Sequence, residues 1–262
     1  MLYVLSPAKA LDYETPLPEA IAKMATKPRF VPHSAELIDV LAPKSRDEVA
    51  ALMDLSDDLA ELNVGRYAAW SKRFTAKNSR PAVWAFDGDV YGGLAARELS
   101  EVDLAWAQQH VAILSGLYGV LRPLDRMQPY RLEMGTRLAT ARGSDLYAYW
   151  GDTISRCLNT AQPRKKGAIV INLASQEYFR AVDRKALKAR VIDCVFEDWK
   201  NGEYKIISFF AKRARGLMAR HAITQRITEP GELESFGAEG YRFAPEASEP
   251  DRLVFRRRVV AG

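Results

Sequence analysis

Five short apolar runs, each followed by small or polar residues, are the feature that most constrains the fold of this chain. They cover residues 2–5, 82–86, 111–114, 168–173 and 204–210. Runs of this length, bounded by turn-forming residues, are typical of buried β-strands. Between them lie stretches of helical periodicity, such as residues 48–62, where apolar residues recur every three or four positions. The alternation predicts a mixed α/β (α+β) protein with a central mixed sheet.

The length and composition fit one integrated domain spanning residues 1–262. The chain is 48% apolar and 27% charged, which is typical of a globular protein, and it contains no repeat, heptad run or linker. No window approaches the ~18 apolar residues that a membrane span needs, and the N-terminus lacks the pattern of a signal peptide. We therefore expect a cytoplasmic protein without a membrane partner. Cys157 and Cys194 fit no metal or redox spacing, so we expect both to be buried as small apolar side chains.

The residues that follow the five runs predict where a ligand binds. Ser6, Asp87, Ser115, Ser175 and Lys212 each come shortly after one of them. If the strands run parallel, their carboxyl ends meet at one edge of the sheet, where ligands usually bind. We expect these strand ends to line a single cleft.

The net charge of +5 is unevenly distributed along the chain. Residues 1–120 carry 12 basic and 16 acidic side chains (net −4), residues 121–228 carry 21 and 10 (net +11), and residues 229–262 carry 5 and 7 (net −2). Three stretches contain no acid: 62–86, 153–176 and 204–228. A positively charged cleft for polyanions is the leading interpretation. The alternative is that these side chains only solvate helix faces.

Residues 53–70 resemble a helix-hairpin-helix element. The sequence predicts a helix, a tight turn at Asn63-Val64-Gly65, and a second helix that carries Arg66, with Lys72 and Arg73 close behind. Such hairpins hold a DNA phosphate with backbone amides. One of the two usual glycine positions is occupied by Asn63, so an ordinary helical hairpin packed on the core is the alternative.

Two further segments carry clustered basic residues. Residues 114–135 are too rich in Gly, Pro, Arg and Tyr for a regular element, so they predict an ordered, functional loop. Its arginines Arg122, Arg126 and Arg131 suit phosphate or carboxylate binding, unless Asp125 and Glu133 pair with them internally. Residues 212–221 follow a predicted strand and open a helix with Lys212, Arg213, Arg215 and Arg220, the strongest electrostatic signal in the chain.

Short polar motifs give weaker signals. Ser6-Pro7-Ala8-Lys9 matches the S-x-x-K of serine acyltransferases, but Pro7 disfavours a helix interior and the companion motifs are missing. Asp87-Gly88-Asp89 could bind Mg²⁺ or act as an acid–base pair, although a tight turn explains it better, because Asp and Gly favour turns. The nucleotide, hydrolase and zinc motifs are absent, so we expect no cofactor and no transition-metal site.

The longest motifs closely resemble those of the bacterial YaaA family of peroxide stress-response proteins, over nearly the whole chain. They are SPAKALDY (6–13), FDGDVYGGL (86–94), LSGLYGVLRPLDRMQPYRLEMG (114–135), LYAYWGD (146–152), INLASQEYF (171–179) and IISFFAKRARGLMARH (206–221). The resemblance implies a cytoplasmic protein that limits unincorporated iron and oxidative damage. It also implies DNA binding, a mixed α/β fold, a positively charged cleft and a helix-hairpin-helix element at residues 53–70. It transfers no catalytic residue.

The sequence thus supports a main hypothesis and two alternatives. The main hypothesis is a stress-response protein that binds double-stranded DNA, largely independently of sequence, through backbone phosphates. Its candidate contacts are Lys9, Asn63, Gly65, Arg66, Lys72, Arg73, Arg122, Arg131, Lys212, Arg213, Arg215 and Arg220.

The first alternative is an enzyme that acts on a small anionic ligand in the same cleft. Carboxylates and amides at strand ends suit acid–base chemistry better than phosphate binding alone. Its catalytic candidates are Lys9, Asp87, Asn172 and Glu177. The second alternative is an iron-sequestering protein, for which no ligand cluster is visible.

Overall fold

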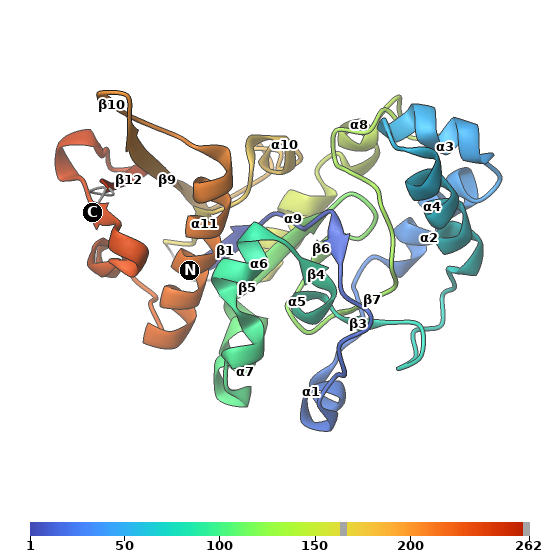
Figure 1. Cartoon of the computed structure of the whole chain (residues 1–262), viewed down its shortest axis with the longest axis horizontal. Coiled ribbons are helices and arrows are strands. Elements are labelled where there is room, and N and C mark those ends of the chain that lie inside the picture. The colour runs from blue at the N-terminus through green and yellow to red at the C-terminus, as the bar shows by residue number, and fades with distance from the viewer. Residues whose placement is uncertain (163–166, 259–262) are drawn as a thin grey trace.

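The computed structural model describes residues 1–162 and 167–258, and an eight-stranded mixed sheet forms its centre (Figure 1). The strand order is β11-β12-β9-β8-β1-β5-β6, and β10 pairs with β9. The five neighbours β12, β9, β8, β1 and β5 run parallel, while β6, β10 and β11 are antiparallel to their partners. Their bounds are β1 (Leu2–Leu5), β5 (Val111–Ser115), β6 (Gly119–Leu121), β8 (Ile169–Asn172), β9 (Arg190–Lys200), β10 (Glu203–Lys205), β11 (Arg242–Phe243) and β12 (Arg252–Arg257). The mixed α/β fold predicted from the sequence is confirmed.

Short strands and helices surround this sheet. Two antiparallel pairs lie outside it: β2 (Ala10–Leu11) with β4 (Phe86–Asp87), and β3 (Arg80–Pro81) with β7 (Arg126–Met127). The α-helices are α1 (Glu19–Met24), α2 (Val31–Leu41), α3 (Arg46–Met53), α4 (Asp57–Ala69), α5 (Ala82–Ala85), α6 (Asp89–Leu94), α7 (Glu101–His110), α8 (Leu146–Trp150), α9 (Thr153–Thr160), α10 (Gln176–Phe179) and α11 (Ser208–Gln225). Short 3₁₀ turns cover Ala96–Glu98, Pro230–Ser235, Ala238–Gly240 and Pro245–Ala247. Of the described helices, none has the length and apolarity to cross a membrane.

Three of the five predicted strands form the middle of the sheet. Residues 2–5, 111–114 and 168–173 correspond to β1, β5 and β8. β1 lies between the other two and all four of its residues are buried, because both faces of a central parallel strand are covered. These three continuous apolar runs therefore predicted the central strands of the sheet correctly.

The other two predicted strands are wrong over most of their length. Residues 82–85 form α5, whose first amide, that of Ala82, donates to the carbonyl of Asp125, and only Phe86–Asp87 is extended. Residues 204–210 divide between β10 and the start of α11, which begins at Ser208. A short apolar run does not distinguish a buried helical turn from a strand.

The predicted turn at residues 63–65 is also wrong, because these residues lie inside the continuous helix α4. Asn63 is buried and its Nδ2 donates to the carbonyl of Leu59 at 2.7 Å, while Arg66 donates to Asn63 Oδ1 at 3.2 Å. The chain instead turns between α3 and α4, where Asp54 adopts a left-handed φ of 52°. Helix α4 then opens on Asp57 and Asp58, whose carboxylates would repel a phosphate.

Two smaller predictions are confirmed: the burial of both cysteines, and the largely irregular structure of residues 114–135. Cys157 and Cys194 are both buried and unpaired. Residues 114–135 are largely irregular and ordered, with β6 and β7 as their short extended parts, and many of their apolar side chains belong to the core. The loop therefore contributes to the core as well as to the surface.

Candidate functional site

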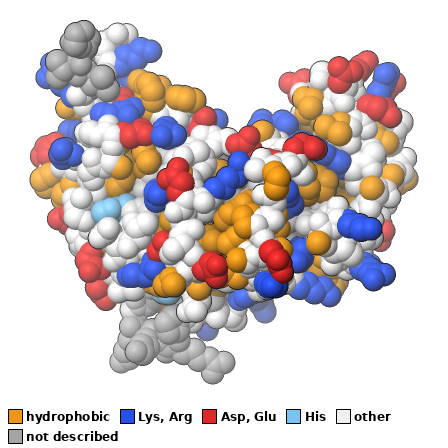
Figure 2. Space-filling view, turned by 60° about the horizontal axis from the view of Figure 1, so that its bottom comes forward, with side chains coloured by type: hydrophobic (Ala, Val, Ile, Leu, Met, Phe, Trp, Pro, Cys, Tyr) orange, Lys and Arg blue, Asp and Glu red, His pale blue; other side chains and the backbone are white. Residues whose placement is uncertain are grey.

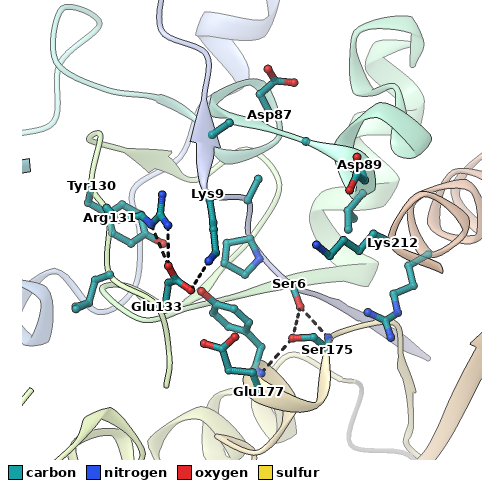
Figure 3. Close-up of a pocket in the computed structure, with 18 residues that line it drawn as sticks. Ser6, Lys9, Asp87, Asp89, Tyr130, Arg131, Glu133, Ser175, Glu177 and Lys212 are labelled. Atoms are coloured by element: carbon teal, nitrogen blue, oxygen red, sulfur yellow. Dashed lines mark hydrogen bonds and ion pairs between the residues drawn. The ribbon is translucent and has the colours of Figure 1, made fainter. Parts of the chain in front are cut away.

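A pocket of about 390 Å³ lies beyond the carboxyl ends of β1 and β8 (Figure 3). This is the edge of a parallel sheet at which α/β proteins usually bind ligands. Its polar lining comes from five separate segments and consists of Ser6, Lys9, Asp87, Asp89, Tyr130, Arg131, Glu133, Ser175, Glu177, Tyr178, Lys212 and Arg215. The predicted convergence of strand ends is thus observed for the segments after residues 5, 86, 173 and 210.

Hydrogen bonds tie the segments after β1 and β8 together at the floor of the pocket. The amide of Ser175 donates to Ser6 Oγ at 2.8 Å, and Ser6 Oγ donates to Ser175 Oγ at 3.3 Å. Tyr91 anchors the same segment by donating its hydroxyl to the carbonyl of Ser6 at 3.0 Å. The two serine hydroxyls therefore have fixed positions facing the cavity.

Glu133 joins two cations at one side of the pocket. Lys9 Nζ lies 2.8 Å from Glu133 Oε2, and Arg131 donates to Oε1 through Nε at 3.0 Å and Nη2 at 2.9 Å. Burial alone would raise the pKa of Glu133, but hydrogen bonds from Lys9 and Arg131 outweigh it and lower that pKa below its ordinary value. Glu133 therefore stays ionised and offsets part of the local positive charge.

The S-x-x-K pair of the sequence does not form a catalytic dyad here. Ser6 is bonded to Ser175, whereas Lys9 extends in a different direction and contacts Glu133 (Figure 3). A lysine base must lie within hydrogen-bond reach of the serine that it activates. Lys9 remains a pocket cation.

The crossing of α6 and α11 positions the opposite side of the pocket. A Cβ on Gly216 would lie 1.8 Å from the carbonyl oxygen of Val90, and one on Gly93 would lie 2.2 Å from that of Arg213. Only glycine permits this backbone approach. The close contact holds Lys212 and Arg215 of α11 beside Asp89, the first residue of α6.

Lys212 and Arg215 differ from the cations at the Glu133 side. Neither pairs with a carboxylate in the part of the chain that the structure describes. Arg215 is mostly buried, burial lowers its pKa, and its Nε has no hydrogen-bond partner among the described residues. An Arg without a counterion in such a place is costly unless an anion joins it.

Glu177 places a further carboxylate in the pocket lining. The amide of Gly135 donates to Glu177 Oε1 at 2.9 Å, and Tyr147 donates to the Glu177 carbonyl at 3.0 Å. The second carboxylate oxygen is not involved in these contacts. Glu177 thus has a fixed position and retains capacity to accept a hydrogen bond from a ligand.

Two tyrosines of the pocket were not foreseen as site residues. Tyr130 and Tyr178 are 5% and 8% exposed, and burial raises the pKa of both hydroxyls. Tyr130 shares a 2.6 Å hydrogen bond with Ser115 Oγ, which connects the end of β5 to the pocket wall. The sequence signal that could have indicated Tyr130 as a site residue is its position next to Arg131 in a Gly- and Pro-rich loop.

Several predicted site residues lie outside the pocket. Asn172 donates to Asp193 Oδ1 at 2.7 Å and does not line the cavity. Three of the predicted DNA contacts instead form ion pairs with carboxylates: Arg122 with Asp125 at 2.9 Å, Arg213 with Glu239 at 2.6 Å, and Arg220 with Glu98 at 3.0 Å. The internal pairing of Arg122 and Arg131 that the sequence left open as an alternative is therefore what the structure contains.

A second depression, which we call the basic groove, has a different character. It has a volume of about 580 Å³ and is lined by Ala25, Thr26, Lys27, Lys72, Arg73, Phe74 and Arg126. Four of these seven side chains are basic and none is acidic. Lys72 and Arg73 are exposed, and no ion pair of theirs occurs within residues 1–162 and 167–258.

The face of the molecule drawn in Figure 2 does not present one continuous basic stripe over the described residues. Figure 2 shows a face hollowed between two raised ends, on which basic and acidic side chains are interspersed. Residues 164–166, which supply three of the four basic side chains of the acid-free stretch 153–176, lie outside the described residues. The segmental charge of +11 is thus divided among ion pairs, the pocket and scattered positions.

Fold and sites together define a mixed α/β protein with a charge-lined pocket at the carboxyl edge of its sheet and a separate basic groove. The family model described as "Peroxide stress protein YaaA" matches residues 1–247. The chain belongs to the YaaA family of peroxide stress proteins, as its motifs indicated.

Relatives named "UPF0246 protein" are similar along their full length. The one from Paracidovorax citrulli is 64% identical over 258 residues, covering 98% of this chain and 99% of the relative. Those from Verminephrobacter eiseniae and Ralstonia pickettii are 63% and 60% identical, covering 100% and 99% of this chain and 100% of each relative. These names state no activity, so the function must be argued from the sites.

Proposed function

We propose that this protein acts in the cytoplasm during peroxide stress by binding double-stranded DNA through backbone phosphates, and that it limits free iron and oxidative damage. Membership of the family supports the stress role. The observation that carries the DNA proposal is the basic groove, where Lys27, Lys72, Arg73 and Arg126 gather without a carboxylate in the lining. Unneutralised cations release counterions from DNA, whereas ion-paired ones gain little.

The groove is built on an ordered framework. Phe74 contacts Trp70 and Tyr118 edge-on, at centroid distances of 6.2 and 6.3 Å, which fixes the segment that carries Lys72 and Arg73. Arg126 Nη2 donates to the carbonyl of Ala22 at 3.1 Å, which restrains the Arg126 side chain. Preorganised cations lose less side-chain entropy on binding a phosphate than free ones do.

The groove is also favoured over the pocket as the DNA contact. Four carboxylates, Asp87, Asp89, Glu133 and Glu177, line the pocket beside its four cations. A phosphodiester strand would be repelled by them. We therefore assign the proposed phosphate contacts to Lys72 and Arg73 among the residues predicted from the sequence, with Lys27 and Arg126 beside them.

Fluorescence anisotropy with labelled duplex DNA across a salt series tests this assignment. The Lys72→Ala/Arg73→Ala variant should bind more weakly and lower the slope of log Kd against log salt by about 2, because each phosphate contact contributes about 0.9. The matched control is Arg184→Ala/Lys185→Ala, which removes the same two residue types from another exposed segment. Absence of binding by the wild type at low salt, or an equal loss in the control, would reject the proposal.

The iron effect is tested in cells. If iron limitation follows from DNA binding, cells that lack the endogenous protein and express Lys72→Ala/Arg73→Ala should keep the high chelatable iron of the deletion strain after a peroxide challenge. Cells expressing the control pair should return to wild-type iron. Full restoration of low iron by the groove variant, at matched protein level, would contradict a link between the two activities.

A second candidate function is action on a small anionic substrate. The pocket favours it, because Lys9, Asp87 and Glu177, three of the four residues considered for acid–base work, line one cavity with Lys212 and Arg215. Cavities of 300–1,000 Å³ with a few convergent polar groups are typical of small-molecule sites. Binding of a defined small molecule to this pocket is the measurement that supports or rejects it.

A further inference from the structure

The charges in the pocket are not arranged for a simple anion. Glu133 is held by Lys9 and Arg131, so these three side chains satisfy one another. Lys212 and Arg215 remain without a carboxylate partner among the described residues. Lys212 and Arg215 on α11 are therefore available to bind an anionic group of a ligand.

Carboxylates without a cation partner face the same cavity. Glu177 lies on α10, below Ser175 in Figure 3, and Asp89 lies near Lys212 at the start of α6. Neither forms an ion pair within the part of the chain that the structure covers. Because Asp89 lies on the side of Lys212, Glu177 is the carboxylate that remains separate from the cations, and the hydroxyls of Ser6 and Ser175 lie between Glu177 and Lys212.

A ligand that pairs with the cations and with the free carboxylate of the pocket must itself carry a negative and a positive charge. An anion alone would pair with Lys212 and Arg215 but would leave Glu177 without a cation, and a cation alone would pair with Glu177 but would leave Lys212 and Arg215 without an anion. Arg215 and Glu177 are only partly exposed, and a charged group in such a place is costly without a partner. The volume of about 390 Å³ lies in the range of small-molecule sites.

We propose that the pocket binds a small zwitterion, with its carboxylate or phosphate group at Lys212 and Arg215 and its protonated amine at Glu177. This rests on the second candidate function and names the ligand class of that site. Arg215 offers a guanidinium fork for two oxygens of the anionic group, and Lys212 adds a point charge. Glu177 accepts from the amine with the carboxylate oxygen that Gly135 leaves free.

Isothermal titration of the full chain with four probes tests the proposal. γ-Aminobutyrate and phosphoethanolamine carry both charges, with a carboxylate and a phosphate respectively, while succinate carries only negative charge and ethanolamine only positive charge. At least one zwitterion should bind, about tenfold or more tightly than succinate or ethanolamine, since each additional charge-assisted contact adds about that factor. The comparison of the two zwitterions distinguishes a carboxylate ligand from a phosphate ligand.

Variants locate the binding. Lys212→Ala should weaken the zwitterion about tenfold, and Arg215→Lys, which keeps the charge but loses the fork, should weaken it as well. The control Lys200→Ala removes an exposed lysine elsewhere and should bind as the wild type does. Glu177→Gln should remove the preference for zwitterions over succinate. Circular dichroism and thermal unfolding establish that each variant is folded.

The outcomes separate this inference from the function on which it rests. If succinate binds as tightly as the zwitterions and Lys212→Ala weakens both, the small-anion function stands and the zwitterion inference is overturned. If no probe binds, or if Lys212→Ala binds as tightly as the wild type, both are overturned.

Discussion

Glu133 shows how a single carboxylate can neutralise basic residues that look free in the sequence. Lys9 and Arg131 look like phosphate ligands in the sequence, but both contact this carboxylate, at 2.8 and 2.9 Å. Glu133 is close to Arg131 in the sequence but far from Lys9, so only the pairing with Arg131 was foreseeable from the sequence. Charge counts along a chain therefore overstate the positive potential of the folded surface.

Changing Glu133→Gln should destabilise the protein by about 2 kcal/mol at neutral pH, because the negative charge that pairs with Lys9 and Arg131 is lost and only one acceptor oxygen remains. Since the folded-state pKa of Glu133 is below its ordinary value of about 4.3, this contribution is present at neutral pH and lost as pH falls through the folded-state pKa. Urea unfolding of wild type and variant at pH 7 and at successively lower pH measures it. A stability difference that stays constant down to pH 3 would contradict this role.

At the scale of elements, the sequence predicted strands best where both faces are buried. β1, β5 and β8 are continuous apolar runs and were found, whereas β9 and β12 alternate buried side chains with charged ones such as Asp193 and Arg256, and were missed. The run at 204–210 was misread because Phe209 and Phe210 are exposed at the start of α11. Apolar content reports burial, and tertiary contacts decide between helix and strand.

Helix α4 gives the sharpest element-scale prediction. Gly65 lies inside it, is exposed, and has no atom within 4 Å of the position a Cβ would occupy. Gly65→Ala should therefore stabilise the protein by about 0.5–1 kcal/mol, through helix propensity and reduced freedom of the unfolded chain. Thermal unfolding measures this, with Ala68→Gly on the same helix as the reverse control. A hairpin turn at residues 63–65 would instead make Gly65→Ala destabilising, so a lower Tm would contradict the continuous helix.

At the scale of the whole molecule, the sequence predicted that strand ends meet and the structure adds that they enclose a pocket. Ser6, Asp87, Ser175 and Lys212 do converge, although two of the five runs were not strands. The basic groove was not foreseeable as a unit, since its residues lie at 27, 72–73 and 126 and come together only through folding. The molecule thus carries two separate charged sites where the sequence predicted one cleft.

The direct test of this separation compares groove and pocket variants in one DNA titration. We predict that Lys72→Ala/Arg73→Ala weakens duplex binding and lowers the salt slope by about 2, while Lys212→Ala leaves both unchanged within error. Both variants remove exposed cations, two in the groove and one in the pocket, so general electrostatics would lower the salt slope in both, about twice as much in the groove variant. An unchanged salt slope in the groove variant together with a lowered one in Lys212→Ala would contradict the account and place the DNA in the pocket.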